Sequence, residues 1–176
     1  FEFVEKPFDR TRLLNFISRA VENLNLRNQN KEYETKLFSS YDLIGNSKNI
    51  STIRDQIEKI SITDSRIFIN GPSGSGKELI ARKIHKKSKR KDKPFIILNG
   101  ALLDINKYEL ELFGEEKENG AISYGALEKA NKGTLLIDQV SEIPLDIQSK
   151  ILRVLTDQKF KRINGSSDLT VDVRLI

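Results

Sequence analysis

Hydrophobic residues recur between positions 41 and 176 with two spacings, one typical of buried strands and one typical of helices. Short apolar runs predict buried strands over 66–69, 95–98, 134–137 and 171–176. Apolar residues three or four positions apart predict helices from about 50 to 61 and over 78–85, 107–113 and 145–157. Apolar strands that alternate with helices predict an α/β fold, with a mainly parallel sheet covered on both faces.

The first 40 residues have a different pattern. Apolar and polar residues alternate from Phe1 to Phe8 and predict a strand that ends at Pro7. A helix follows, capped at Asp9 or Thr11, with Leu13, Leu14, Phe16, Ile17, Ala20, Val21 and Leu24 on one face. The polar stretch that begins at residue 23 predicts a solvent-exposed linker helix, with a coiled coil as the alternative.

The composition fits one domain with room for a linker or part of a second unit, since the chain has 176 residues, 38% hydrophobic and 31% charged. No apolar run approaches the roughly 20 residues that span a bilayer, so we expect no membrane insertion. The chain has no cysteine and a single histidine, which excludes a disulfide framework and a thiolate metal site. We therefore expect a cytoplasmic protein, and the absence of methionine predicts a fragment of a longer one.

The net charge of +5 comes largely from lysines and arginines between positions 83 and 93. Such a cluster between a helix and the next strand is typical of a solvated loop, and a nucleic-acid contact is the alternative.

A glycine-rich turn between a predicted strand and a predicted helix has the spacing G-x-x-x-x-G-K. Its residues are Gly71, Pro72, Ser73, Gly74, Ser75, Gly76 and Lys77, followed by Glu78. Glycines let successive backbone N–H groups turn inward around phosphate oxygens at a helix N-terminus, and the lysine contacts the outer phosphates. A general P-loop has Ser or Thr after the lysine to bind magnesium, and Glu78 departs from that pattern.

A second feature supports nucleotide binding. The run from Gly133 to Ile137 ends in Asp138, an acid at the carboxyl end of a predicted strand. Ligands bind at this edge of open α/β sheets, so Asp138 is expected to hold Mg²⁺ directly or through water beside the phosphates.

Several motifs in order resemble the AAA+ domain of bacterial enhancer-binding proteins, ATPases that remodel sigma-54 RNA polymerase. The motifs are Asp42 to Gly45, Gly71 to Arg82, Asn99 to Ala101, Glu111 to Gly114, Gly125 to Glu128 and Gly133 to Asp138. The resemblance implies a P-loop AAA+ core with three α-β-α layers. It also accounts for Glu78, because Gly-Lys-Glu is characteristic of this family.

The start of the chain resembles the end of a response-regulator receiver domain, with Lys6 as the lysine that senses phosphorylation. A receiver tail, a linker helix and then an AAA+ domain is the order found in NtrC-family response regulators. Within that family the chain is most similar to the NtrX-like group. The implied domains are a receiver tail (1–22), a linker helix (23–40) and a truncated AAA+ domain (41–176). The implied partners are a sensor histidine kinase and promoter DNA, bound through parts outside this chain, and further copies in a dimer or ring.

The resemblance assigns roles to individual residues. Ile44 and Gly45 would line the adenine pocket of ATP, Lys77 would bind the outer phosphates, and Asp138 would order Mg²⁺. Asn99 would hold a catalytic glutamate, which the family has directly after the aspartate.

This chain has Gln139 at the position of that glutamate. A glutamine orients water but accepts no proton, and a general base is worth roughly a hundredfold to ten-thousandfold in rate. We therefore expect ATP binding with slow hydrolysis, unless Glu142 substitutes as the base.

The sigma-54 contact loop of the family, G-A-F-T-G-A, has no match between Gly114 and Gly125. A regulator that does not contact sigma-54 is therefore expected. The alternatives are an ATP-hydrolysing sigma-54 activator and a small-molecule kinase. Glu78 and the lack of a recognisable lid or acceptor site argue against the kinase.

Overall fold

The computed structural model describes residues 21, 42–102 and 107–176, and it separates residues 45–176 as one unit from residues 1–44. The predicted receiver strand, its helix and the linker lie outside the described residues, apart from position 21. Among the described residues, no helix is both long and apolar enough to cross a membrane.

A parallel sheet forms the centre of residues 45–176, with strand order β1 (Phe95–Asn99), β4 (Thr134–Asp138) and β7 (Arg174–Leu175). Asn99 at the end of β1 is the register partner of Asp138 at the end of β4. Both strands therefore end at the same edge of the sheet. This arrangement confirms the predicted α/β fold with a parallel sheet.

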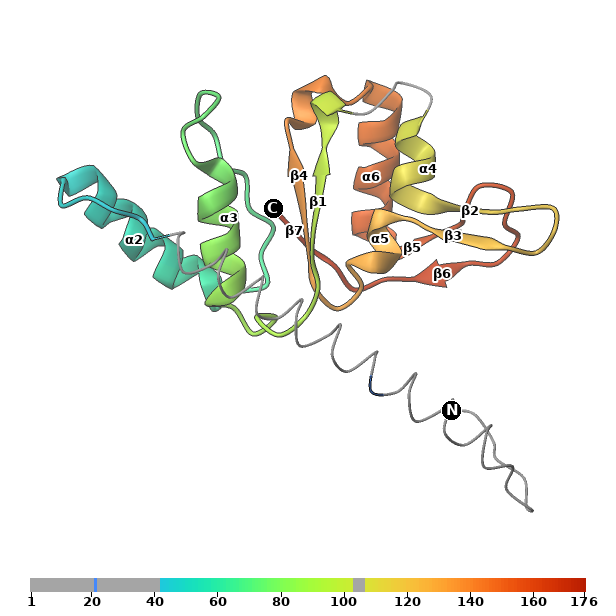
Figure 1. Cartoon of the computed structure of the whole chain (residues 1–176), viewed down its shortest axis with the longest axis horizontal. Coiled ribbons are helices and arrows are strands. Elements are labelled where there is room, and N and C mark those ends of the chain that lie inside the picture. The colour runs from blue at the N-terminus through green and yellow to red at the C-terminus, as the bar shows by residue number, and fades with distance from the viewer. Residues whose placement is uncertain (1–20, 22–41, 103–106) are drawn as a thin grey trace, which may run out of the picture. The chain divides into compact units, whose positions relative to one another are not determined.

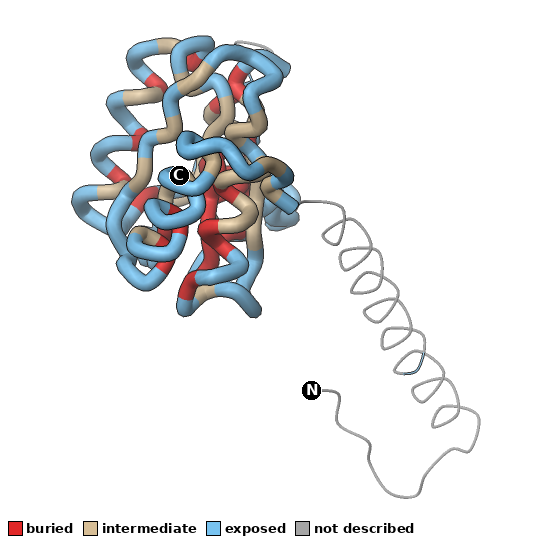
Figure 2. The backbone as a smooth tube through the Cα atoms, turned by 90° about the vertical axis from the view of Figure 1, so that its left-hand side faces the viewer, coloured by how far each residue is buried: buried red, intermediate tan, exposed pale blue. Residues whose placement is uncertain are grey.

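Helices cover both faces of this sheet (Figure 1). On one side lie α2 (Lys48–Ser61) and α3 (Lys77–Lys86). On the other lie α4 (Tyr108–Phe113), α5 (Ala126–Lys129) and α6 (Leu145–Asp157). Ile147, Ile151 and Val154 recur on one face of α6 and form a buried cluster with Leu98 and Leu135 of the sheet. The buried segments accordingly lie inside this unit in Figure 2, and the predicted three-layer architecture is confirmed.

Helix α2 is anchored at both ends. At its start, the Ser47 side chain accepts a hydrogen bond from Ile50 N at 3.4 Å. At its end, the guanidinium of Arg174 from β7 donates to Ile60 O at 2.8 Å and to Ser61 O at 3.4 Å. A cation at a helix C-terminus satisfies free carbonyls and complements the helix dipole. Burial lowers the pKa of Arg174, and this contact links α2 to the sheet.

The prediction of a buried strand over 66–69 is wrong. These residues form no strand, and Phe68 is 79% exposed. The segment passes beside β7 with a hydrogen bond from Ile67 N to Leu175 O at 3.2 Å. A short apolar run does not distinguish a core strand from a segment that lines a cavity, and this segment lines one.

The predicted strand over 171–176 is also only partly correct, because within it only Arg174–Leu175 pairs, as β7. Just before it, β6 (Leu169–Thr170) pairs with β5 (Lys159–Phe160) in a separate antiparallel sheet. A second hairpin consists of β2 (Gly114–Glu116) and β3 (Ile122–Tyr124). The two hairpins are joined, since Glu116 N donates to Ile163 O at 3.0 Å and Ile163 N to Gly114 O at 2.9 Å.

Arg162 reinforces the junction between the hairpins. Its guanidinium pairs with Glu128 at 2.6 Å and with Glu116 at 2.8 Å, and it lies 5.6 Å from the ring centre of Tyr124. The hydrogen bonds to Glu128 and then to Glu116 raise the pKa of Arg162, so this cation stays charged at any practical pH. The β2–β3 hairpin is therefore attached to α5 through one side chain.

The basic stretch over 83–93 includes a residue that the fold itself uses. Arg90 pairs with Asp172 at 2.6 Å and with Asp64 at 3.1 Å, and it donates to Gly133 O at 3.3 Å. Lys87 pairs with Glu58 of α2. These contacts favour the interpretation as a structural loop, and the nucleic-acid contact stays a prediction.

Candidate functional site

The glycine-rich loop over 71–76 leads into α3, and two of its glycines have backbone angles that favour glycine. Gly74 has φ +76° and Gly76 has φ +87°, in the left-handed region. A Cβ at Gly74 would meet nothing within 4 Å, so the constraint there is the backbone angle and not space. Gly76 is the N-cap of α3 and makes no side-chain capping bond, so the first N–H groups of the helix remain for an anion.

Lys77, the first residue of α3, turns back over this loop. Its Nζ donates to Pro72 O at 3.0 Å and to Gly71 O at 3.1 Å. The ammonium group is thereby held at the mouth of the loop. A phosphate would be a stronger partner for it than either carbonyl, because hydrogen bonds between two charged groups are shorter and stronger.

Glu78 takes no part in this cradle. Its carboxylate pairs with Arg82 one turn further along α3, at 2.7 Å. Such a pair between positions i and i+4 stabilises a helix modestly. Its place among the predicted cofactor-binding residues stays a prediction.

The ends of β1 and β4 supply the other polar groups. Asp138 is partly buried at the end of β4. Asn99 is its register partner, and Asn99 Oδ1 accepts a hydrogen bond from Ala101 N at 2.9 Å. The Asn99 carbonyl oxygen thus stabilises its own turn, the 3₁₀ turn η1 (Gly100–Leu102).

Gln139 follows Asp138 in an unusual backbone conformation, with φ +55° and ψ +50°. Its N–H donates to Asp138 Oδ1 at 3.0 Å, and it begins the 3₁₀ turn η3 (Val140–Glu142). The neighbouring turn leaves no room for a side chain, because a Cβ on Gly100 would lie 2.6 Å from Gln139 O. The two turns at this edge of the sheet are therefore in direct backbone contact.

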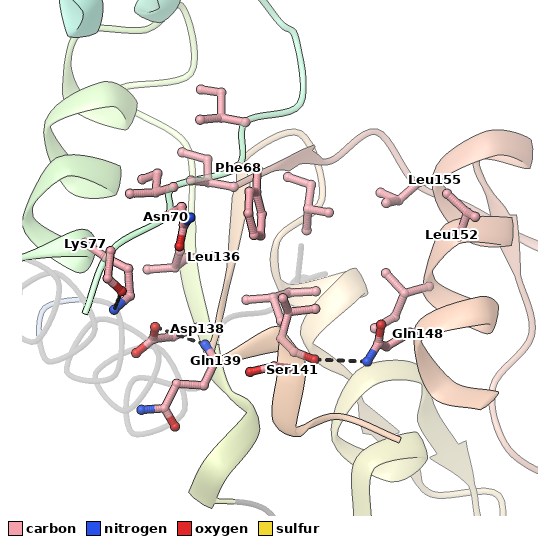
Figure 3. A pocket seen from close by; sticks show the side chains of 18 of the residues that line it. Phe68, Asn70, Lys77, Leu136, Asp138, Gln139, Ser141, Gln148, Leu152 and Leu155 are labelled. Atoms are coloured by element: carbon pink, nitrogen blue, oxygen red, sulfur yellow. Dashed lines mark hydrogen bonds between the residues drawn. The ribbon is translucent and has the colours of Figure 1, made fainter. Parts of the chain in front are cut away.

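A cavity of about 870 Å³ brings the loop and the strand end together. Lys77 is the cation and Asp138 the acid among the residues that line it. Figure 3 shows Lys77, Asp138 and Gln139 at one end, and Gln148, Leu152 and Leu155 of α6 at the other. The lining residues are Ile67, Phe68, Ile69, Asn70, Gly71, Lys77, Leu136, Ile137, Asp138, Gln139, Val140, Ser141, Leu145, Gln148, Ser149, Ile151, Leu152, Leu155, Leu175 and Ile176.

The cavity has an apolar wall that the sequence pattern did not predict. Leu145, Gln148 and Leu152 lie at helical spacing on α6 and line the cavity together. Leu145 is 79% exposed, and Leu152 is 60% exposed. The signal was present in the sequence, since α6 carries apolar residues on more than the one face that a core helix needs.

Of the predicted site residues, Gly71, Lys77, Asp138 and Gln139 line the cavity. The others are outside its lining: Ile44, Gly45, Pro72, Ser73, Gly74, Ser75, Gly76, Glu78, Asn99 and Glu142. Gly45 has φ +134°, and Glu142 is exposed in η3. Ile44 is 88% exposed and belongs to the unit of residues 1–44, so its adenine-binding role stays a prediction.

Within the described part of the chain, no group of three or more His, Cys, Asp or Glu residues gathers as a metal site. The residues nevertheless fit magnesium, since Mg²⁺ bound with a nucleotide commonly uses one or two carboxylates, phosphate oxygens and water. Asp138 would be that carboxylate, and Lys77 and the N–H groups of the loop would bind the phosphates.

Comparisons with known proteins agree with this arrangement. Residues 43–176 match the family described as "Sigma-54 interaction domain". The nitrogen assimilation regulatory protein NtrX of Azorhizobium caulinodans is 42% identical over 177 residues, which cover 100% of this chain and 39% of that protein. A crystal structure of NtrX from Brucella abortus matches with a TM-score of 0.82 and 41% identity, over 100% of this chain and 39% of that one. A crystal structure of the same protein in complex with ATP matches with a TM-score of 0.76 and 41% identity, over 100% and 37%.

Proposed function

Because the chain belongs to the sigma-54 interaction domain family, we propose that residues 41–176 bind ATP with Mg²⁺ inside a transcriptional regulator of the two-component type. The observation that carries the proposal is the shared cavity of Lys77 and Asp138. One positive and one negative side chain at a glycine-rich helix N-terminus fit a phosphate chain and its metal ion. The ATP complex of the related NtrX supports the same ligand.

The proposed roles follow the chemistry of each group. Gly71, Pro72, Ser73, Gly74, Ser75 and Gly76 surround the phosphates with backbone N–H groups, except at Pro72, which has none. Lys77 neutralises the outer phosphates, and Asp138 orders Mg²⁺. A single acid suffices here because water and phosphate oxygens complete the shell of the ion. Ile44 and Gly45 contact the adenine.

The chain spans 39% of the length of the A. caulinodans relative. We infer a receiver tail over 1–22, a linker over 23–40 and the nucleotide-binding domain over 41–176. Phosphorylation by a sensor histidine kinase would control it in the cytoplasm, and promoter DNA and further copies of the protein would be its partners.

Hydrolysis is proposed to be slow, since Gln139 replaces the expected carboxylate base and Glu142 does not line the cavity. The hairpin from Gly114 to Tyr124 lacks the G-A-F-T-G-A sequence, so contact with sigma-54 is not part of the proposal. An ATP-hydrolysing sigma-54 activator is the second candidate, and the family match supports it.

The binding test uses a fluorescent ATP analogue with the wild-type chain and the variants Lys77→Ala and Lys86→Ala. Lys86 is exposed near the other end of α3, so the control removes the same charge from the same helix. A lost charge-assisted contact of about 1.5–3 kcal/mol weakens binding roughly 10-fold to 150-fold. We expect this loss in Lys77→Ala only, and equal affinity in all three proteins would refute the proposal.

Hydrolysis is tested by measuring phosphate release from ATP in the presence of Mg²⁺, for the wild-type chain and for Gln139→Glu. If Gln139 limits hydrolysis, the glutamate raises the rate by roughly a hundredfold or more. Brisk and equal rates in both proteins would favour the sigma-54 activator instead.

A further inference from the structure

Five exposed lysine side chains, called here the lysine surface, lie near the starts of the central strands. Lys89, Lys91 and Lys93 belong to the loop between α3 and β1. Lys129 ends α5, and Lys132 belongs to the turn before β4. Within the described part of the chain, none of the five forms an ion pair, and none lines the cavity of the proposed site. Their charges are therefore available to a partner.

A network of hydrogen bonds joins the two loops that carry these lysines. The guanidinium of Arg90 pairs with Asp172 at 2.6 Å and donates to Gly133 O at 3.3 Å. Lys132 N donates to Asp172 O at 2.7 Å, and Asp172 N donates to Asn131 Oδ1 at 3.0 Å. The two loops are thus attached to the same residue, Asp172, and form one continuous surface.

The loop before β1 is itself a series of tight turns. Lys91 N donates to Ser88 O at 3.3 Å, and Lys93 N donates to Arg90 O at 2.9 Å. Ser88 is buried, and its hydroxyl oxygen accepts a hydrogen bond from Arg90 N at 3.1 Å. The backbone under the lysines is therefore ordered before any partner arrives, which lowers the entropy cost of binding.

The lysine surface lies at the edge of the sheet opposite to the proposed nucleotide site. Strands β1 and β4 start together at Phe95 and Thr134 and end together at Asn99 and Asp138. A strand of five residues separates its ends by roughly 13 Å. In Figure 1 the loops with the lysines enter the sheet at its lower end. The surface is therefore distinct from the loop and acid that would hold a nucleotide.

The charges on this edge favour an anion. Asp64 and Asp172 are already paired with Arg90, and Asp92 is exposed within the loop. The cations therefore outnumber the carboxylates, and the field of the surface is positive.

The lack of apolar side chains narrows the kind of anion. None of the exposed large hydrophobic residues in the described part of the chain lies within 87–94 or 129–133. Helices that lie in a membrane surface insert apolar side chains, protein partners use aromatic anchors, and single-stranded nucleic acids stack on aromatic rings. Lysines on polar turns instead fit the phosphates of a duplex, which are contacted without reading the bases.

We propose that the lysine surface binds the phosphate backbone of double-stranded DNA without sequence preference. The choice of DNA rests on the proposed function as a transcriptional regulator, whereas the surface itself is independent of the nucleotide site. Such contacts would add affinity to the promoter DNA that other parts of the regulator bind.

The test is fluorescence anisotropy of a labelled DNA duplex of arbitrary sequence, titrated with the wild-type chain over a series of salt concentrations. The loop variant combines Lys89→Gln, Lys91→Gln and Lys93→Gln. The control combines Lys117→Gln, Lys159→Gln and Lys161→Gln, three exposed lysines at the two hairpins, so that both proteins have the same net charge.

Each phosphate contact contributes about 0.9 to the slope of log K against log salt concentration. The loop variant should therefore lose about 2.7 of the slope and bind roughly tenfold or more weakly at low salt, whereas the control should stay within about threefold of the wild type. A second variant, Lys129→Gln with Lys132→Gln, should lose about 1.8 of the slope.

Equal slopes and affinities in the loop variant and the control would overturn the proposal. So would a wild-type chain that binds vesicles containing phosphatidylserine but not the duplex. ATP binding is measured on the same proteins and should be equal in all of them, because these lysines lie outside the cavity. Duplex binding that fails while ATP binding holds overturns the lysine surface alone, and failure of the wild type to bind ATP refutes the proposed function.

Discussion

His85 should make the stability of this chain depend on pH below about 6.5. The imidazole is buried on α3, its Nδ1 lies 2.8 Å from Thr134 Oγ1, and its ring centre lies 5.1 Å from that of Phe95. Burial lowers the pKa of His85 below 6.5, and the charges of Arg174 and Arg82 act in the same direction. Asp92 and the backbone of Lys93 oppose them.

The sign follows from proton binding in the two states. Above the unfolded pKa of 6.5, His85 is neutral in both states and adds no pH dependence. As the pH falls below 6.5, the unfolded chain takes up a proton that the folded chain refuses, so folding loses free energy until the folded pKa is reached. The loss is at most about 1.4 kcal/mol between pH 7.5 and 5.5, because one pH unit corresponds to about 1.36 kcal/mol.

The assay is urea unfolding of the wild-type chain and of His85→Gln between pH 5.5 and 7.5. The variant should be less stable overall and show a flatter dependence on pH, since glutamine does not titrate. His85 is the only histidine of the chain, so an NMR titration of the folded protein reports its pKa without ambiguity. A midpoint at or above 6.5, or the same pH dependence in both proteins, would refute the reasoning.

Two further substitutions test contacts near the site and at the hairpins. Gly100→Ala should weaken ATP binding and cost about 1–3 kcal/mol of stability by crowding Gln139 O. Gly120→Ala adds a Cβ that meets nothing within 4 Å but strains a backbone with φ +78°, so it should cost stability and leave ATP binding unchanged. Arg162→Met should cost about 1–3 kcal/mol in urea unfolding because it leaves the partly buried Glu128 unpaired. Adding Glu128→Gln should restore part of that loss, and a double variant less stable than Arg162→Met would contradict this account.

The parts of the fold that were predicted correctly depend on local patterns. Strands β1 and β4 and helix α6 agree closely with their apolar runs and spacing, because each buries one continuous face or segment. The common edge of Asp138 and Asn99 also follows from the parallel arrangement, since such strands end together. The proposed nucleotide site at this edge could therefore be inferred from sequence alone.

The parts that were missed depend on residues far apart in the chain. Arg162 contacts Glu116 and Glu128, which are 46 and 34 positions away, and no local pattern indicates these partners. The hydroxyl of Tyr108 likewise meets Glu142, 34 positions away. In the same way, an apolar run predicts burial at Phe68 but does not reveal whether a neighbouring strand pairs with it on each side.

The backbone conformation of Gln139 does not depend on its side chain, so the position of this residue and its acid–base chemistry can be tested separately. A left-handed conformation costs a residue other than glycine roughly 1–2 kcal/mol, and it persists only where the surroundings determine it. Here the contact with Gly100, the bond to Asp138 Oδ1 and the bond from Glu142 N hold Gln139 in that conformation. None of these contacts involves the Gln139 side chain. A glutamate at this position would therefore enter a backbone that is already arranged, so a comparison of the two side chains tests the missing carboxylate alone.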